Sequence, residues 1–342
     1  MTILFFHFDG TCNDPTDAVH YHEQDSSITN VLKSHLLLGG QLSSDSCMTR
    51  LPSGGVSFYY SGVGTYGSNL ARYVNAGFAV ENGDVATILR AALVDFQCYY
   101  HSEVSNIVLI GFSRGAALAR RFAALIDCFL DRAIVIEAVM DTVASIGWPN
   151  LDPAQRPKQE VVFEYGHTLP RCVRQALHLV ALDEQRLAFR PTLMNQDERV
   201  EEVWLTGVHS DIGGGYRKDG LADISLMTII VWLQQQLGVY FYETLERLGI
   251  NQISGAYDIL KIRPTHLGKV HYQSRLSWST RLTLAPRHCC VLINGKPRQE
   301  SSPYWHSSVL ERVSVKPSYQ PIAFCSAPVV VWGENVNIDG VV

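Results

Sequence analysis

The sequence predicts an α/β fold: a mainly parallel sheet with helices on both faces. Two observations lead to this prediction. From residue 1 to about 235, short runs rich in β-branched and aromatic residues alternate with long helical stretches. The runs at 107–110 and 134–136 are also apolar without interruption, as expected for strands that are buried on both faces. Each element can then be placed in order along the chain.

Strands are expected at 3–8, 56–61, 106–111, 133–139 and 203–207. Helices are expected at 28–38, 85–101, 116–130, 172–183 and 224–237, and Gly238 ends the last of them. Beyond this point the pattern predicts a short helix near 243–248 and strand-like runs at 281–284, 290–293 and 329–332. No linker rich in proline, serine or glycine intervenes. We therefore expect an α/β core at 1–238 and a C-terminal extension at 239–342 that packs on it.

Composition limits the class of protein. Of the 342 residues, 46% are hydrophobic and 18% are charged, which is enough to form a large core. The 33 acidic and 28 basic residues give a net charge of −5 without blocks of like charge, so we expect no nucleic-acid partner. The apolar runs are too short for a spanning helix, and the first residues lack the pattern of a signal peptide. We expect synthesis in the cytoplasm and eight cysteines that are reduced thiols.

The segment 106–120 carries the motif most specific for catalysis. An apolar strand runs through Gly-Phe-Ser-Arg-Gly directly into a helix of small residues. This context predicts a nucleophile elbow, a tight turn that holds Ser113 in a strained conformation with its Oγ exposed at a helix N-terminus. Gly111 and Gly115 leave room for the close backbones, and the N–H of Arg114 is the expected first donor of an oxyanion hole. Chance occurrence of the five-residue pattern is the alternative.

A serine nucleophile needs a base, and in this type of sheet the acid and the histidine follow the serine at later strand ends. Asp141 follows the strand at 133–139, and His209 follows the strand at 203–207. We therefore expect Ser113, Asp141 and His209 to be the catalytic residues. The alternatives are that Asp141 caps a turn, that His209 is a structural loop residue, and that His306 is the base.

Three further segments leave alternatives open. Asp211 either supports the base or binds a metal, and the glycines at 213–215 either shape the loop or hold an anion. Two groups of residues could hold a metal but favour another interpretation. His20 and His22 beside Glu23 favour an exposed loop, and Cys289 and Cys290 beside His288 favour buried thiols. We expect no metal and no cofactor.

The second oxyanion donor is expected after the strand at 3–8, in the loop Asp9-Gly10-Thr11. There the backbone N–H of Gly10 or Thr11 completes the hole, while Asp9 holds the loop or pairs with Arg114. An ordinary turn is the alternative. A phosphoryl-transfer site is disfavoured because its second aspartate is replaced by Thr11. The glycine-rich segment 60–67 is either a wall of the substrate pocket or a plain loop.

Four separated motifs occur in order at 8–11, 111–116, 141–143 and 207–216. Together they resemble the α/β-hydrolase family that includes the phospholipase effectors of bacterial type VI secretion. The likeness extends to 60–65, 181–186 and 306–312, so it covers nearly the whole chain. The resemblance implies that Ser113 is the nucleophile of a Ser-Asp-His triad that cleaves glycerophospholipid esters.

The expected function is therefore a serine ester hydrolase, a phospholipase A that works through an acyl-enzyme. An esterase or thioesterase for soluble acyl substrates is the alternative that uses the same residues. A non-catalytic binding or toxin-scaffold module is the alternative of another class. The resemblance further implies a lipid or acyl-ester substrate, transient membrane contact, an immunity, delivery or complex partner, and delivery to another cell by secretion.

Overall fold

A nine-stranded sheet forms the centre of the protein. The computed structural model describes residues 2–11, 13, 28–41, 48–63, 84–130, 132–144, 169–242, 262–272 and 283–332. In this part of the chain the strand order is β13-β11-β7-β6-β5-β4-β1-β3-β2, parallel throughout except for the antiparallel pair of β2 and β3. The strands are β1 (Thr2–Phe8), β2 (Met48–Arg50), β3 (Val56–Tyr60), β4 (Val104–Phe112), β5 (Ile134–Met140), β6 (Val173–Ala181), β7 (Val200–Leu205), β11 (Tyr304–Trp305) and β13 (Val330–Val331).

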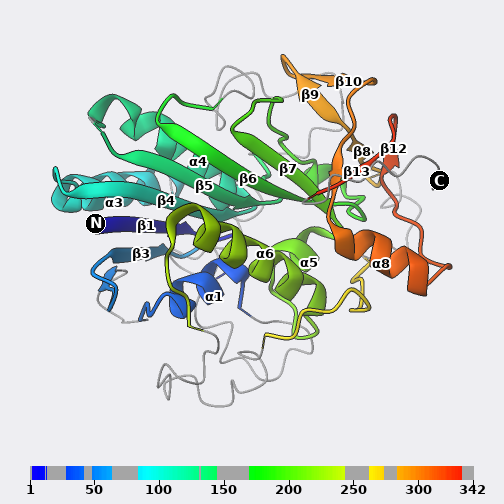
Figure 1. Ribbon diagram of the computed structural model, residues 1–342, viewed down its shortest axis with the longest axis horizontal. Coiled ribbons are helices and arrows are strands. Elements are labelled where there is room, and N and C mark those ends of the chain that lie inside the picture. Colours follow the sequence, from blue (N-terminus) through cyan, green and yellow to red (C-terminus); the bar gives the residue numbers. More distant parts are fainter. Residues whose placement is uncertain are drawn as a thin grey trace.

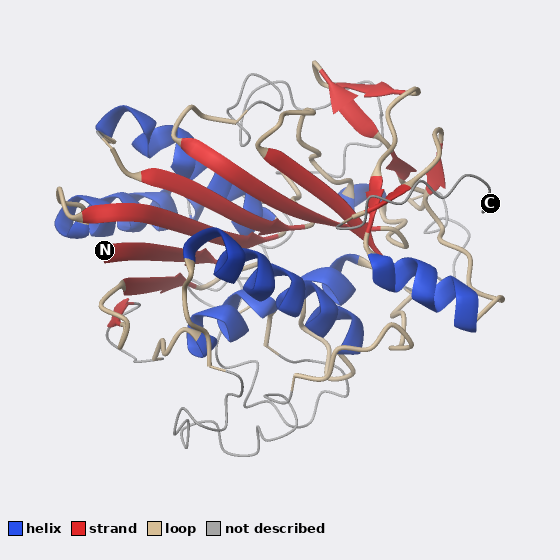
Figure 2. Cartoon of the chain, in the orientation of Figure 1, coloured by secondary structure: helices blue, strands red, loops and turns tan. Residues whose placement is uncertain are grey.

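Helices cover both faces of this sheet (Figure 1). On one face lie α1 (Asn30–Leu37), α5 (His209–Gly213) and α6 (Gly220–Leu237), and on the other lie α3 (Asp84–Tyr99) and α4 (Arg114–Ile126), as Figure 2 shows. The remaining described elements are η2 (Asp127–Phe129), η3 (Leu187–Phe189), α8 (Ser307–Val315), and two small sheets that pair β8 (His288–Cys289) with β12 (Phe324–Cys325) and β9 (Val291–Ile293) with β10 (Lys296–Arg298). The predicted fold class is confirmed.

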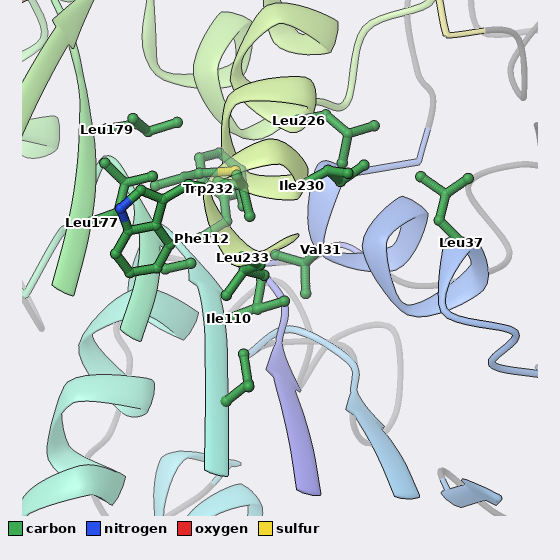
Figure 3. Close-up of a cluster of buried hydrophobic side chains, with 14 of the residues drawn as sticks. Val31, Leu37, Ile110, Phe112, Leu177, Leu179, Leu226, Ile230, Trp232 and Leu233 are labelled. Atoms are coloured by element: carbon green, nitrogen blue, oxygen red, sulfur yellow. The ribbon is translucent and has the colours of Figure 1, made fainter. Parts of the chain in front are cut away.

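Alternating side chains of the strands form a core on each face. Phe6 and Phe8 of β1 pack with Phe122 of α4 on one face, with ring centroids 4.8 and 5.6 Å apart. The other face is drawn in Figure 3, where β4, β6, α1 and α6 contribute the apolar side chains. Its labelled members are Val31, Leu37, Ile110, Phe112, Leu177, Leu179, Leu226, Ile230, Trp232 and Leu233. Burial on both faces explains why the central strands are apolar almost throughout.

The predicted helix at 172–183 is wrong, because this segment forms the central strand β6. It contains good helix formers, but it lies between β5 and β7 and pairs in parallel with both. Leu177 and Leu179 face one core, whereas Val180 belongs to a different apolar cluster on the other side. Tertiary pairing therefore overrides the local propensity.

The C-terminal part adds strands to the same sheet. Tyr304 and Trp305 of β11 align with Val203 and Trp204 of β7, and β13 follows in parallel. The predicted runs at 290–293 and 329–332 correspond to β9 and β13. The expected helix near 243–248 and residues 281–282 lie outside the described residues. The division into a core and an extension at residue 238 stays a prediction.

Among the helices that the structure describes, none combines the length and the apolar content needed to cross a bilayer.

Two histidines are buried between β1, β3 and α1. His7 Nδ1 lies 3.1 Å from the Phe58 carbonyl oxygen, and His35 Nδ1 lies 2.8 Å from the Ser57 Oγ. Burial lowers the pKa of His7 well below its ordinary value, and the neighbouring His35 adds to this shift. Burial also lowers the pKa of His35, to about 4. Both side chains are therefore neutral in the folded protein at neutral pH.

This predicts an acid-sensitive stability. Below about pH 6.5 the unfolded chain takes up protons on both histidines. In the folded protein His35 takes up a proton only near pH 4, and the pKa of His7 is also well below its ordinary value, so stability falls as the pH drops from about 6.5. His35 alone accounts for up to about 3 kcal/mol of that loss. Urea unfolding at pH 7 and pH 4.5 should show a smaller loss for His35→Gln than for the wild type. The exposed His101→Gln is the control and should lose as much as the wild type; an equal loss in all three proteins contradicts the prediction.

Candidate active site

The ends of the parallel strands bring the predicted site residues to one edge of the sheet. Phe8 at the end of β1 aligns with Gly111, and Phe112 at the end of β4 aligns with Met140. Met140 in turn aligns with Leu179 of β6, and Ala181 aligns with Leu205 of β7. The loops that follow these strands therefore lie side by side, as the strand-end argument requires.

The turn after β4 has the predicted strained geometry. Ser113 adopts φ 57° and ψ −122° immediately before α4, in the left-handed region that costs a residue other than glycine about 1–3 kcal/mol. A Cβ on Gly115 would lie 2.1 Å from the Phe8 carbonyl oxygen, so glycine is required there. The Ser113 N–H donates to the Met140 carbonyl at 3.0 Å. Ser113 as a whole is 5% exposed between these strand ends, and the expected exposure of its Oγ stays a prediction.

His209 and Asp141 are in direct contact. His209 Nδ1 lies 2.5 Å from Asp141 Oδ2, and both residues are buried. Asp141 adopts φ 40°, and its other oxygen accepts the Ala181 N–H at 3.1 Å. The Val143 N–H donates to the Ser113 carbonyl at 3.1 Å, which ties the Asp141 loop to the elbow. The contact orients the imidazole so that Nε2, not Nδ1, is free to act on another group.

A residue that the sequence argument missed also holds Asp141. Arg287 donates from one terminal nitrogen to Asp141 Oδ1 at 2.6 Å and from the other to Oδ2 at 2.9 Å. Burial alone would raise the pKa of Asp141, but the Arg287 charge and the hydrogen bonds from His209 and Arg287 outweigh it. The net result is a pKa held well below its ordinary value, so the carboxylate is ionised at neutral pH.

Two aromatic rings enclose the imidazole of His209. The Phe112 ring lies 4.6 Å away in a tilted arrangement, and the Phe189 ring lies 4.8 Å away, nearly edge-on. The backbone N–H of His209, at the start of α5, donates to Glu184 Oε2 at 3.2 Å. Glu184 is itself paired with Arg186 at 2.7 Å. Because Phe112 precedes Ser113 in the chain, these contacts place His209 next to the elbow.

The loop after β1 is held by Asp9. The buried Asp9 carboxylate accepts hydrogen bonds from the Gly10 N–H at 2.6 Å, from Thr29 Oγ1 at 2.8 Å and from the Tyr59 hydroxyl at 2.6 Å. The Arg114 Nε donates to Thr11 Oγ1 at 2.5 Å, so this side chain contacts the loop through threonine. Because the Gly10 N–H already has an acceptor, the geometry favours the N–H of Thr11 over that of Gly10 as the second oxyanion donor.

The structure gives Asp211 and the glycines after it structural contacts. Asp211 Oδ2 accepts the Val208 N–H at 3.0 Å, and Asp211 Oδ1 lies 2.6 Å from His271 Nδ1, so Asp211 pairs with His271 and not with His209. A Cβ on Gly213 would lie 2.1 Å from the Phe112 ring, and one on Gly214 would lie 2.7 Å from the backbone of α1. These glycines therefore allow the loop to pack closely over the elbow.

His306 lies in another part of the molecule. Its Nδ1 accepts the Ser308 N–H at 3.2 Å and caps α8, and its Nε2 lies 3.2 Å from Thr228 Oγ1. It lines a hollow of 1320 Å³ beside α6 and β11 whose walls include Thr228 and Trp332. Ser113, Asp141 and His209 are not among the residues that line this hollow.

Several predicted side chains fall outside the described residues: His20, His22, Glu23, Cys12, Cys47 and 64–67. Within the described part of the chain, no group of three or more histidine, cysteine or acidic side chains is arranged to hold a metal ion, and the cysteines there are thiols. His288 lies 2.6 Å from Ser326 Oγ, and Cys289 Sγ accepts the Trp305 indole N–H at 3.4 Å.

Sequence reasoning did not identify three residues that surround the His209–Asp141 pair: Arg287, Glu184 and Phe189. Arg287 is 146 positions from Asp141, in a segment without regular pattern, so no spacing rule points to it. The one available signal is physical: a buried catalytic carboxylate needs a cationic partner. Glu184 and Arg186 lie in one of the segments that carry the family resemblance.

The parallel sheet, the strained strand–turn–helix and the acid and histidine at later strand ends define a protein of the α/β-hydrolase type. A family model described as "T6SS, Phospholipase effector Tle1-like, catalytic domain" matches residues 3–130 and 128–235. This match covers more than half of the chain, so the chain belongs to that family, the catalytic domains of phospholipase effectors of type VI secretion. By that description, the family is one of lipolytic hydrolases.

The solved structures to which this chain is similar are distant in sequence. The chain is similar to a crystal structure of an uncharacterized protein from Pseudomonas aeruginosa, with 17% identity and a TM-score of 0.45 over 75% of this chain and 48% of that one. It is also similar to the Tle1 effector bound to the VgrG spike, with 21% identity and a TM-score of 0.37 over 63% and 51%. The chain thus spans about half the length of both. No curated protein matches it.

Proposed function

We propose that this chain is a phospholipase A that cleaves acyl esters of glycerophospholipids through Ser113, Asp141 and His209. The observation that carries the proposal is the His209–Asp141 contact of 2.5 Å beside the strained Ser113. A strained serine at a helix N-terminus, a histidine next to it and a buried carboxylate on the far nitrogen are the parts that acyl transfer needs. Family membership supports a phospholipid as the substrate.

In the proposed mechanism, His209 Nε2 takes the Ser113 hydroxyl proton while Oγ attacks the ester carbonyl. The backbone N–H groups of Arg114 and Thr11 stabilise the negative oxygen that develops. His209 then gives its proton to the leaving lysophospholipid oxygen, and an acyl-enzyme remains. His209 then takes a proton from a water molecule, which attacks the acyl-enzyme carbonyl. As the bond to Oγ breaks, His209 returns that proton to Oγ, so the fatty acid leaves and the free serine is restored. Asp141 stays ionised and stabilises the imidazolium in both steps.

Family membership also supports a proposal about where the protein acts and what it binds. We propose that the protein is made in the cytoplasm and delivered to another cell by type VI secretion, with a delivery partner and an immunity partner, because its family is that of such effectors. Contact with the target membrane is transient in this proposal. Residues 1–238 supply the hydrolase core, and 239–342 form an extension packed on it.

Replacement of Ser113 tests the nucleophile. Ser113→Ala should abolish ester hydrolysis and labelling by a fluorophosphonate probe, because loss of a serine nucleophile costs on the order of 10⁶ in turnover. Thermal unfolding should change little, since the small hydroxyl leaves almost no cavity. Ser105→Ala, at the other end of the same strand, is the control and should keep full activity. Residual activity within about tenfold of wild type, or a probe adduct on another residue, contradicts the assignment.

The two candidate bases can be separated by their effect on labelling. His209→Gln should suppress the reaction of Ser113 with the fluorophosphonate by about 10³-fold or more, because the hydroxyl loses its proton acceptor. His306→Gln should leave the labelling rate unchanged, since His306 caps α8 and lines a hollow that Ser113, Asp141 and His209 do not line. Mass spectrometry of the labelled serine at timed intervals measures both rates. The reverse order of effects would make His306 the base.

The form of the lipid should control the rate. With a net charge of −5, the chain is repelled by anionic bilayers, so release of fatty acid should be faster from detergent micelles than from intact anionic vesicles of the same lipid. Added salt should reduce this difference by screening. Equal or faster release from vesicles contradicts the expectation. No release from either form, with short-chain esters still cleaved, would support an esterase for soluble acyl substrates instead.

A further inference from the structure

Arg287 stands at the entry to β8, in the part of the chain that follows the family match, and is only 5% exposed. A guanidinium buried to this degree requires partners for its donors, because an unpaired charge in the interior is very costly. The terminal nitrogens of Arg287 donate four hydrogen bonds, to Asp141 after β5, to Ala181 at the end of β6 and to Phe189 in η3. Arg287 therefore joins the C-terminal part to the edge of the sheet where Ser113 and His209 lie.

The contacts of Arg287 form two pairs. The first pair is bidentate: its two terminal nitrogens reach the two Asp141 oxygens at 2.6 and 2.9 Å. Such planar pairing fixes the rotation of the carboxylate as well as its position. The second pair goes to backbone carbonyls, that of Ala181 at 2.9 Å and that of Phe189 at 2.5 Å. Arg287 thus fixes a side chain and a loop together.

Both fixed groups touch the same imidazole. The Asp141 oxygen that accepts one Arg287 nitrogen is also the oxygen 2.5 Å from His209 Nδ1. The Phe189 ring, whose backbone carbonyl accepts from Arg287, lies 4.8 Å from the His209 ring. Arg186 stacks over the Phe189 ring, with its guanidinium carbon 3.7 Å from the ring centroid, and keeps that ring in place. The orientation of His209 therefore depends on Arg287 from two directions.

We propose that Arg287 is a positioning residue of the ester hydrolase, which holds Asp141 and Phe189 on two sides of His209. The inference rests on the proposed triad and extends it by a residue from the C-terminal part of the chain. Arg287 does not touch the reacting atoms. It acts through the carboxylate and the aromatic ring that orient the base.

The charge of Arg287 has a separate consequence. Among the described residues, the charged groups that contact His209 or its bonded partners are Asp141 after β5, the Glu184–Arg186 pair after β6, and Arg287. Arg287 balances the charge of Asp141, just as Arg186 balances that of Glu184. Without Arg287, Asp141 faces His209 as an uncompensated negative charge and favours the protonated imidazole. The base would then be lost at a higher pH than in the wild type.

Arg287→Met and Arg287→Lys separate geometry from charge. The Met variant should label with the fluorophosphonate about 10²-fold more slowly, because the base is no longer held in place. The acidic limb of its pH profile should also move to higher pH. The Lys variant keeps the charge without the planar fork. Its acidic limb should stay where the wild type has it, while its rate remains about tenfold low.

Arg199→Met is a matched control. Arg199 likewise donates from two nitrogens to a carboxylate, that of Asp197, and to two backbone carbonyls, those of Pro170 and Val173. This variant should leave the rate and the pH profile per folded molecule unchanged. Circular dichroism and thermal unfolding give the folded fraction for every variant.

The outcomes distinguish this inference from the function on which it rests. Labelling of Arg287→Met at the wild-type rate with the wild-type pH profile overturns the positioning role, while the serine hydrolase stands. If Arg287→Met does not fold, Arg287→Lys decides: a folded Lys variant with the wild-type rate overturns the need for the planar fork. If the wild type itself is not labelled at Ser113, the proposed function fails first.

Discussion

The ionised carboxylate of Asp141, buried at the edge of the sheet, is the constraint on which the site depends. A carboxylate in the interior is stable only when hydrogen bonds and an opposite charge replace the water that it has lost. Asp141 receives the Ala181 N–H, His209 Nδ1 and both terminal nitrogens of Arg287. These groups come from the end of β6, the start of α5 and the residue before β8. Satisfying one charge therefore fixes the relative positions of four segments of the chain.

The same principle recurs at the neighbouring strand ends. Three buried aspartates follow β5, β6 and β7: Asp141, Asp183 and Asp211. Each one contacts a side chain from beyond residue 238, with Arg287 on Asp141, Tyr319 on Asp183 and His271 on Asp211. Burial raises the pKa of Asp183 to about 6 even though the carboxylate accepts several hydrogen bonds, so keeping its ionised form in the interior costs free energy. The C-terminal part is thus bound to the sheet edge mainly through the acids that the strands place there.

The residues at the edge of the sheet could be predicted from the sequence, but most of the contacts that hold them in place could not. Apolar strands and the strand-end rule placed Ser113, Asp141 and His209 on adjacent loops, because both depend on local pattern and on the parallel pairing of neighbours. The segment of β6 was predicted as a helix, since its residues have good helix propensity and only pairing with β5 and β7 makes it a strand. Arg287 could not be predicted, because its position follows from an electrostatic need that has no sequence period.

The strained backbone at Ser113 and at Asp141 is stabilised by hydrogen bonds between the two turns that contain these residues. Among the described residues, the non-glycine residues with positive φ are Ser113, Asp141 and Asn294, so two of the three lie at this edge. The Ser113 N–H donates to the strand that precedes Asp141, and the Ser113 carbonyl accepts from Val143 just beyond Asp141. Each strained turn is therefore held by hydrogen bonds to the other. Strain of about 1–3 kcal/mol per residue persists only where the surroundings determine the conformation completely, and it concentrates where geometry serves chemistry. A fold that used this edge only for packing would have no reason to hold two such residues here, one of them, Asp141, in contact with the buried His209.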